Sequence, residues 1–342
     1  MDKKRGTDSR PLILVTGASG AVGPAVVDIV LNAGYRVRTL SIDPLPDIIR
    51  EKGVEEITGD ITDVPSVRQA MKGVKLVVHL AGLLHISEAS SYMDKEYERV
   101  NVGGTTTVVS EALKANVSRI VFFSTIAVYG QSKGIIVNEN KVPKPDTVYA
   151  KTKFSAEKIV LDAIDGEGSP IGVVLRFGAI YGPRMKGNYR RLTHSLASGR
   201  FLPIGSGKNR RTLVYDRDAA QAVLLAVEHH NAPGKVFNVS DGKFHTVHDI
   251  LLAICRALGK RPPLFSLPLG AVRIMVTMAE KVARYLGSRA PITRTVIDKY
   301  VEDIAVESQR ITDELGFAPI YDLEKGWLET LEIMRQSGDL KK

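Results

Sequence analysis

The sequence is poor in cysteine and in long hydrophobic stretches, and each shortage excludes a class of protein. Cys255 is the single cysteine among 342 residues, so no disulfide can form within the chain, as is usual in a reducing cytoplasm. No apolar run reaches the roughly 18 residues of a membrane-spanning helix. The best candidate, 267–286, is interrupted by four charged residues. We expect this stretch to form an amphipathic helix packed on the protein, and we expect no membrane span.

Acidic residues are absent between Arg184 and Arg211, although the chain carries a net charge of +9. One interpretation is a solvated basic face, and the other is a site for an anionic ligand such as a diphosphate. Nucleic acid is disfavoured, because the stretch has few aromatic residues for stacking and no recognised binding motif. The basic residues are Arg184, Lys186, Arg190, Arg191, Arg200, Lys208, Arg210 and Arg211.

The rest of the composition is ordinary for a globular protein, with 44% hydrophobic and 25% charged residues. Residues 1–10 are polar and lack the apolar core of a secretory signal. We therefore expect a cytoplasmic protein, and we predict no metal centre.

Apolar β-rich runs alternate with helical patterns in the first half of the chain. The expected strand at 74–80 is apolar throughout, as a strand covered on both faces should be. Repeated β-α-β units of this kind predict a Rossmann-type α/β fold with a doubly wound parallel sheet. The expected strands are 12–16, 37–41, 54–57, 74–80, 119–124 and 171–176, and the expected helices are 21–33, 93–115 and 149–163.

Three glycines follow the first expected strand and open the first expected helix. Gly17 permits a tight turn, Gly20 lets backbone N–H groups approach a pyrophosphate, and Gly23 allows the helix to pack closely on the strand. The free N–H groups and the positive end of the helix dipole favour an anion there. We predict that a dinucleotide binds to Gly17, Ser19, Gly20, Ala21, Val22 and Gly23.

The residues expected near the adenosine leave the choice between NAD and NADP open. A carboxylate at the end of the second strand would bond the ribose 2′-hydroxyl and repel a 2′-phosphate. Ser41 stands there instead and does neither strongly. Asp60 and Ile61 follow the third strand and are expected to frame the adenine, with a local cap as the alternative role of Asp60.

The expected domains follow from the position of this glycine turn and from the end of the regular strand–helix alternation after Arg176. Residues 1–177 are expected to form the dinucleotide-binding domain, to which 212–235 return. Residues 178–211 and 236–342 are expected to form a smaller substrate-binding lobe. Such a lobe would cover the carboxyl ends of the strands, where ligands bind in open α/β sheets.

Tyr149 and Lys153 stand four residues apart at the start of an expected helix and therefore share one face. A phenol with a pKa of about 10 is a poor base at neutral pH, and a neighbouring cation is expected to lower that pKa. Tyr149 would then take a proton from a substrate alcohol as hydride leaves for a nicotinamide, while Lys153 would also hold the ribose. The preceding strand ends with two candidate hydroxyls, those of Ser124 and Thr125.

These features occur in an order that resembles the extended short-chain dehydrogenase/reductase family, in particular its nucleotide-sugar epimerases and their 4-keto reductase relatives. The likeness runs from about Pro11 to about Asp241. Besides the glycine turn, it rests on His79-Leu80-Ala81-Gly82, Asn101, Gly104-Thr105, Ser124-Thr125 with Val128-Tyr129-Gly130, Tyr149 with Lys153, and Tyr181-Gly182-Pro183.

The resemblance implies roles that the motifs alone do not assign. Thr125, rather than Ser124, takes the place of the family's catalytic hydroxyl. His79 is either a functional residue or a histidine with satisfied hydrogen bonds at a strand end. The cofactor would also contact Leu80, Ala81, Gly82 and Asn101.

On the substrate side, the resemblance implies that Arg211 binds a nucleotide-sugar diphosphate and that Asn188 lies in the substrate site. Two departures bear on the substrate and the cofactor. Ala179 stands where 4-epimerases usually have an asparagine, so one contact to UDP-glucose is missing. Ser41 replaces the usual acidic residue.

The combined prediction is a homodimeric NAD(P)-dependent epimerase that oxidises and re-reduces C4 of a UDP-hexose or UDP-N-acetylhexosamine. Dehydration is disfavoured, because Ile126 and Ala127 follow Thr125 where dehydratases have acidic side chains. The alternatives are a reductase of 4-keto nucleotide sugars, a steroid-type dehydrogenase and a non-catalytic cofactor sensor. The basic stretch argues against the steroid enzyme, and the intact Thr125, Tyr149 and Lys153 argue against the sensor.

Overall fold

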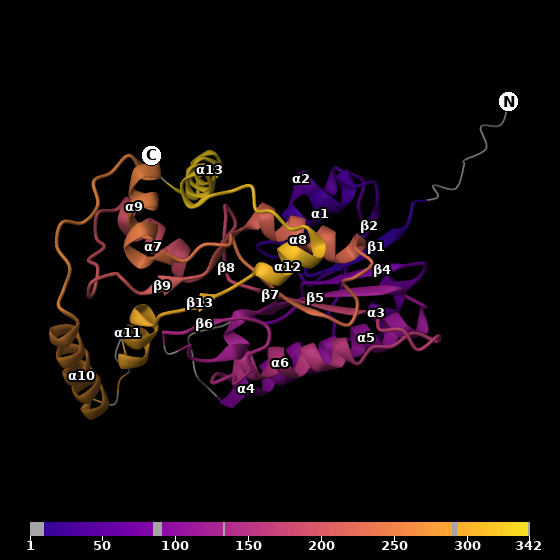
Figure 1. Ribbon diagram of the computed structural model, residues 1–342, viewed down its shortest axis with the longest axis horizontal. Coiled ribbons are helices and arrows are strands. Elements are labelled where there is room, and N and C mark those ends of the chain that lie inside the picture. Colours follow the sequence, from indigo (N-terminus) through magenta and orange to yellow (C-terminus); the bar gives the residue numbers. More distant parts are fainter. Residues whose placement is uncertain (1–9, 85–90, 133, 287, 289–292, 341–342) are drawn as a thin grey trace.

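The computed structural model describes residues 10–84, 91–132, 134–286, 288 and 293–340. The N-terminal segment that we expect not to be a secretory signal therefore lies outside the described residues, except for Arg10. Seven parallel strands form the central sheet (Figure 1) in the order β11-β7-β5-β4-β1-β2-β3, which confirms the predicted doubly wound fold. The strands are β1 Leu12–Thr16, β2 Arg36–Ser41, β3 Glu55–Thr58, β4 Leu76–His79, β5 Arg119–Thr125, β7 Gly172–Phe177 and β11 Val236–Val239.

The strand order reverses between β1 and β4, and this point is where open α/β sheets bind ligands. All five residues of β1 are buried, as the apolar run predicts for a strand covered on both faces. β11 lies in the central sheet although it falls beyond residue 235, where the returning segment was expected to end. The stretch expected to form the lobe therefore also contributes a strand to the sheet.

Helices cover both faces of the sheet and enclose two apolar cores (Figure 1). Helices α1, α2, α8 and α12 pack on one face, and α3, α5 and α6 pack on the other. Side chains cap several starts, as Asp63 does for α3 and Thr147 for α6. These helices are α1 Gly23–Asn32, α2 Asp47–Arg50, α3 Val64–Met71, α5 Thr105–Lys114, α6 Val148–Leu161, α8 Asp216–Glu228 and α12 Gln309–Leu315.

The helix expected at 93–115 is continuous but changes its winding. It consists of α4 Ser91–Tyr97, a π-helix η1 Glu98–Gly104 and α5. A Cβ atom on Gly104 would lie 2.5 Å from the Ile61 side chain, so the helix approaches the loop after β3 closely. The hydroxyls of three successive threonines donate to the carbonyls four residues earlier, at 101, 102 and 103, which satisfies backbone acceptors in the wider turn.

The remaining elements form a lobe beside the end of the sheet from which β7 continues into β8 (Figure 1). Its core gathers around the buried ring of Trp327, which stacks on Tyr181 with ring centres 4.9 Å apart. The strands pair as β8 Ala179–Tyr181 with β10 Leu213–Tyr215, β9 Arg210–Arg211 with β12 His245–Thr246, and β6 Ile136–Val137 with β13 Ala305–Val306. Its helices are α7 Asn188–Ala197, α9 Val247–Leu258, α10 Leu269–Tyr285, α11 Arg294–Val301 and α13 Leu323–Gln336.

Two expectations from the sequence concern the helices of this lobe. Cys255 is buried on α9 and burial raises the pKa of its thiol, as expected for an unreactive cysteine. The stretch 267–286 forms α10, but only one side of this helix packs on the protein. Within the described part of the chain, no helix is both long and apolar enough to cross a membrane.

Candidate active site

The glycine turn connects β1 to α1 and packs against the end of β4. Gly17 has a φ of +71°, and a Cβ atom there would lie 2.7 Å from the backbone of Ala81. Thr16 fixes this edge, because its carbonyl accepts from the N–H of Leu80 at 3.2 Å and its hydroxyl accepts from the N–H of Ala81 at 3.3 Å. The predicted residues Leu80 and Ala81 therefore lie against the turn.

The start of α1 fits an anion. Its first turn has no acidic residue, and no side chain caps it, so its free N–H groups are left for a ligand. The helix begins at Gly23, two residues later than expected, so Ala21 and Val22 belong to the turn. A Cβ atom on Gly23 would lie 2.1 Å from the carbonyl oxygen of Ala18. The close packing is thus between helix and turn, whereas we expected helix and strand.

Ser41 joins the end of β2 to the same turn, because its hydroxyl accepts from the N–H of Ser19 at 3.3 Å. Asp60 accepts from the N–H of Thr62 at 2.8 Å and lies 3.6 Å from the guanidinium of Arg99. Its carboxylate therefore caps the turn after β3, and its contact with an adenine stays a prediction. The side chain of Ile61 is buried beneath η1.

Tyr149 lies in the first turn of α6, which begins where Thr147 accepts from the N–H of Ala150 at 3.2 Å. A hydrogen bond joins its phenol to the hydroxyl of Thr125, at the end of β5. Burial raises the pKa of Tyr149 to about 12, and the Thr125 hydroxyl opposes that rise. Tyr97 lies edge-on to the same ring, with centres 6.1 Å apart.

Lys153 follows one turn later on the same face of α6. Its Nζ lies 4.0 Å from the centre of the Phe122 ring. A Cβ atom on Gly82 would lie 3.9 Å from the same Nζ, so Gly82 is close to the amine. Burial lowers the pKa of Lys153 to about 7, and Glu157 opposes the shift. A lysine that is only partly charged at neutral pH is a weak source of positive charge. The expected lowering of the pKa of Tyr149 is therefore wrong for this chain without a bound cofactor, since desolvation outweighs it.

Beneath Lys153, a buried set of polar side chains continues from α6 into the sheet. Glu157, one turn beyond Lys153, accepts from Ser124 at 2.5 Å and from Arg176 at 2.7 Å. The guanidinium of Arg176 lies 4.8 Å from the centre of the Tyr129 ring. Ser124 thus points into this set and Thr125 points to Tyr149. Glu157 and Arg176 were not among the predicted site residues, although the spacing of four between Lys153 and Glu157 indicates a shared face.

His79 and Asn101 hold the framework around Lys153. The His79 ring lies 2.7 Å from the hydroxyl of Thr16 and 3.0 Å from that of Thr105. Burial, together with Lys153, lowers the pKa of His79 to about 3, so this ring is neutral and both of its nitrogens have a hydroxyl partner. The Asn101 side chain accepts from the N–H of Leu83 at 2.7 Å. It belongs to η1, and π-helical turns are frequent at functional sites.

The basic stretch meets its partners far along the chain. Arg211, expected to bind a diphosphate, donates to the carbonyls of Lys299 at 2.6 Å and Tyr300 at 2.9 Å. It also donates to the carbonyl of Glu302, so its guanidinium holds the end of α11. Arg210 pairs with Asp303 at 2.6 Å. Two arginines of the acid-free stretch are therefore engaged by residues near 300.

Asn188 is exposed at the start of α7, next to Tyr189. Burial raises the pKa of Tyr189 to about 12, and Arg211 opposes the shift. Glu302 interacts electrostatically with both Arg211 and Asp146, which lies just before α6. The start of α7, Arg211 and the start of α6 thus border one region, through Tyr189 and Glu302.

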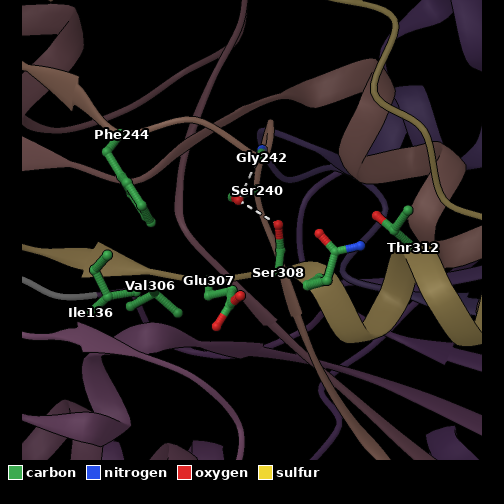
Figure 2. A pocket seen from close by; sticks show the side chains of 9 residues that line it. Ile136, Ser240, Gly242, Phe244, Val306, Glu307, Ser308 and Thr312 are labelled. Carbon is green, nitrogen blue, oxygen red and sulfur yellow. Dashed lines mark hydrogen bonds between the residues drawn. The ribbon is translucent and has the colours of Figure 1, made fainter.

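A pocket lies apart from these residues, between the end of β11, β13 and the start of α12 (Figure 2). The hydroxyls of Ser240 and Ser308 face each other at 2.7 Å, and Ser240 also accepts from the N–H of Gly242 at 3.1 Å. None of the predicted site residues lines it. The lining residues are Ile136, Ser240, Gly242, Phe244, Val306, Glu307, Ser308, Gln309 and Thr312.

The fold and the polar cluster on α6 define a dinucleotide-dependent enzyme, and comparison with known proteins identifies its family. Residues 13–240 match the NAD dependent epimerase/dehydratase family, and the chain belongs to it. The chain is therefore an NAD-dependent oxidoreductase or epimerase of the extended short-chain dehydrogenase type, and its cofactor is NAD.

Relatives with different activities are equally similar to the chain. It is 26% identical over 341 residues to the UDP-glucose 4-epimerase of Vibrio cholerae, with 96% of each chain covered. It is also 26% identical over 332 residues to the 3 beta-hydroxysteroid dehydrogenase/Delta 5-->4-isomerase of Mycobacterium tuberculosis (strain ATCC 25618 / H37Rv), with 93% of this chain and 89% of the relative covered. Among solved structures, MoeE5 in complex with UDP-glucose and NAD has a TM-score of 0.74 and 25% identity, covering 95% of this chain and 99% of that chain.

Proposed function

We propose that the protein is an NAD-dependent 4-epimerase of a UDP-linked hexose or N-acetylhexosamine. The observation that carries this proposal is the hydrogen bond between Thr125 and Tyr149, one helical turn from Lys153. In the proposed reaction, the phenol of Tyr149 would exchange a proton with a sugar hydroxyl, the hydroxyl of Thr125 would hold the reacting oxygen, and the amine of Lys153 would bind the nicotinamide ribose.

In this reaction Tyr149 takes the proton of the 4-hydroxyl while the C4 hydride leaves. Thr125 bonds the same oxygen and keeps it beside the phenol. After the 4-keto sugar has turned its other face, the hydride returns to C4 and Tyr149 gives the proton back to the oxygen, so the overall reaction is redox-neutral. When bound, NAD supplies the hydride acceptor and a positive charge on its oxidised ring.

The pKa values indicate that Tyr149 depends on bound NAD to act as a base. The pKa of Tyr149 is raised to about 12 and that of Lys153 is lowered to about 7. The phenolate therefore needs a further cation nearby. Tyr149 would be an effective base in the loaded enzyme and a poor one without NAD. The turn at Gly17, Ser19 and Gly20 would hold the pyrophosphate, with Asn101 and Gly82 beside the nicotinamide end.

A second candidate is a hydroxysteroid-type dehydrogenase using the same three residues once per turnover. The contacts of Arg211 favour it, because a guanidinium that already serves three carbonyls is less free to bind a diphosphate. If the protein is instead the epimerase, Asn188 and the exposed residues of the basic stretch would have to bind the diphosphate in place of Arg211. The two candidates differ in net redox change.

The deciding experiment identifies the small molecule released when the purified protein is denatured, by mass spectrometry, and then assays turnover. We expect stoichiometric NAD, and interconversion of UDP-glucose with UDP-galactose, or of their N-acetyl forms, without added cofactor. If the protein is empty, takes up NADPH and reduces 4-keto sugars, it is a 4-keto reductase and not an epimerase. If the protein produces NADH when it is given a hydroxysteroid, it is a hydroxysteroid dehydrogenase.

We further propose that the protein is a homodimer whose interface is formed by the helical stretches 93–115 and 149–163. Light scattering of the purified protein tests this, with the mass of one chain as the contradicting result.

A further inference from the structure

Helix α10 lies at the far end of the lobe, away from the central sheet, with α11 beside it (Figure 1). One side of α10 is buried through Val272 and Val276, which pack with Ile297 of α11 and with Ile204. This small cluster attaches the helix to the protein. The opposite side has no covering among the described residues.

The uncovered side is apolar along the whole helix. Ile274 is 60% exposed, Met278 is 62% exposed and Tyr285 is 90% exposed. Met275 and Val282 belong to the same set, at 55% and 57%. With 3.6 residues per turn these five side chains fall within an arc of roughly 100°. Large apolar side chains concentrated on one exposed face mark an interaction site, whereas scattered ones are ordinary.

Basic residues border this apolar arc. Arg273, Lys281 and Arg284 occupy the arc between the apolar side and the buried side, and Glu280 is the one acidic residue of α10. The neighbouring acids are already paired, Asp298 with Arg273 at 2.6 Å and Glu280 with Arg294 at 3.3 Å. Among the described residues, Lys281 and Arg284 form no ion pair.

The charge pattern selects the partner. A second copy of the chain would bring Lys281 and Arg284 close to the same cations of its partner, which opposes association through this face. An anionic lipid surface offers the complement, because headgroups attract the cations while the apolar arc enters the boundary of the acyl chains. The segment leading into α10 adds Leu264 and Phe265, at 87% and 79% exposure.

We propose that α10 is an interfacial helix by which this enzyme binds peripherally to an anionic membrane surface. Its apolar arc, centred on Met278, lies in the interface, and Lys281 and Arg284 contact the headgroups. The proposal is independent of which substrate the enzyme uses.

Co-sedimentation with extruded vesicles tests it. The full chain is mixed with vesicles of phosphatidylcholine alone or with added phosphatidylglycerol, at low and at high NaCl. We expect binding to the phosphatidylglycerol vesicles, weakened at least about tenfold by high salt, and little binding to phosphatidylcholine. Equal binding to both vesicle types, or none to either, would overturn the proposal.

Two α10 variants separate the two contributions. Ile274→Ser with Met278→Ser removes apolar contacts at constant charge, and Lys281→Gln with Arg284→Gln removes charge at constant apolar area. Each is expected to weaken binding at least about tenfold. The matched controls are Ile320→Ser with Leu328→Ser, exposed apolar residues at 68% and 57%, and Lys72→Gln with Lys75→Gln. The controls should bind as the wild type does, and losses equal to those of the α10 variants would contradict a specific surface.

A reporter keeps the test independent of those variants. Tyr285→Trp leaves the apolar arc intact, and its fluorescence should shift to the blue when phosphatidylglycerol vesicles are added. Trp327 is fully buried and should not respond. No shift would overturn the proposal, as would a change of the solution mass in the Ile274→Ser, Met278→Ser variant, which would assign the face to a second copy of the chain.

Discussion

Polar side chains are usually exposed and apolar ones buried, and helices α6 and α10 break this rule in opposite ways. α6 carries Tyr149, Lys153 and Glu157 toward the interior, whereas α10 carries Ile274 and Met278 toward the exterior. On α6, Glu157 pairs with Arg176 and Tyr149 bonds Thr125, as the cost of an unpaired buried charge requires. The exposed apolar groups of α10 find no partners among the described residues. Such mismatches distinguish sites of chemistry from sites of contact.

The largest expected effect on this comparison comes from Tyr149→Phe, which removes the phenol and keeps the ring. Turnover should fall by about a thousandfold or more, since general acid–base catalysis is lost. Bound NAD, measured after denaturation, should stay near the wild-type amount. Tyr35→Phe is the control, because it removes one surface hydrogen bond of 3.2 Å to Glu228. Retained turnover in the Tyr149 variant would refute the assignment.

Glu157→Ala tests whether the buried charges of α6 depend on partners inside the chain. It leaves the buried guanidinium of Arg176 unpaired, so the free energy of unfolding should fall by about 3–5 kcal/mol. Urea denaturation measures the change. Glu332→Ala, on the exposed side of α13, should change it by less than about 0.5 kcal/mol. A similar small loss in both variants would show that the pair is not needed for stability.

The pH dependence of stability tests the burial of Lys153. Its pKa is lowered to about 7, whereas an unfolded lysine titrates at about 10.4. Between these values the unfolded chain binds more protons, so stability rises as the pH rises above about 7. Lys153→Met should lack this rise. The difference between the two proteins should grow by about 2 kcal/mol from about pH 7 to about pH 9 in urea denaturation, and parallel curves would contradict the shift.

The smallest effects separate the two sides of α10. Val276→Ala on the buried side should lower the free energy of unfolding by about 2 kcal/mol, because it leaves a cavity. Ile274→Ser on the exposed side should change it by less than about 0.5 kcal/mol. Thermal denaturation without lipid measures both. A large loss at Ile274 would mean that this face is covered in solution.

The sequence predicted those features that depend only on residues close together in the chain. The alternation of strands and helices predicted the parallel sheet, because period and length are properties of short segments. The glycine turn was predictable since its conformation depends on adjacent residues. The spacing of Tyr149 and Lys153 predicted a shared face for the same reason.

Long-range pairing and burial could not be predicted in this way. Arg211 lacks a nearby acid in the sequence, yet its guanidinium is held by carbonyls at the end of α11. The pKa of Tyr149 moves opposite to the expected direction, because desolvation depends on how completely the site closes. The contact of Tyr97 with Tyr149 could not be predicted either, since it depends on how η1 sets the angle of α4.

The π-helix η1 makes the site sensitive to insertions and deletions. A π turn corresponds to one residue more than an α turn needs. Deleting a single residue within 98–104 would remove this extra residue and close the wide turn, which carries Asn101, to an α-helical one. Asn101 would then turn away from Leu83 and from Thr152, which it now meets at 2.7 Å and 3.2 Å. The stretch 98–104 is therefore constrained in its length as well as in the side chains at positions 101 and 104.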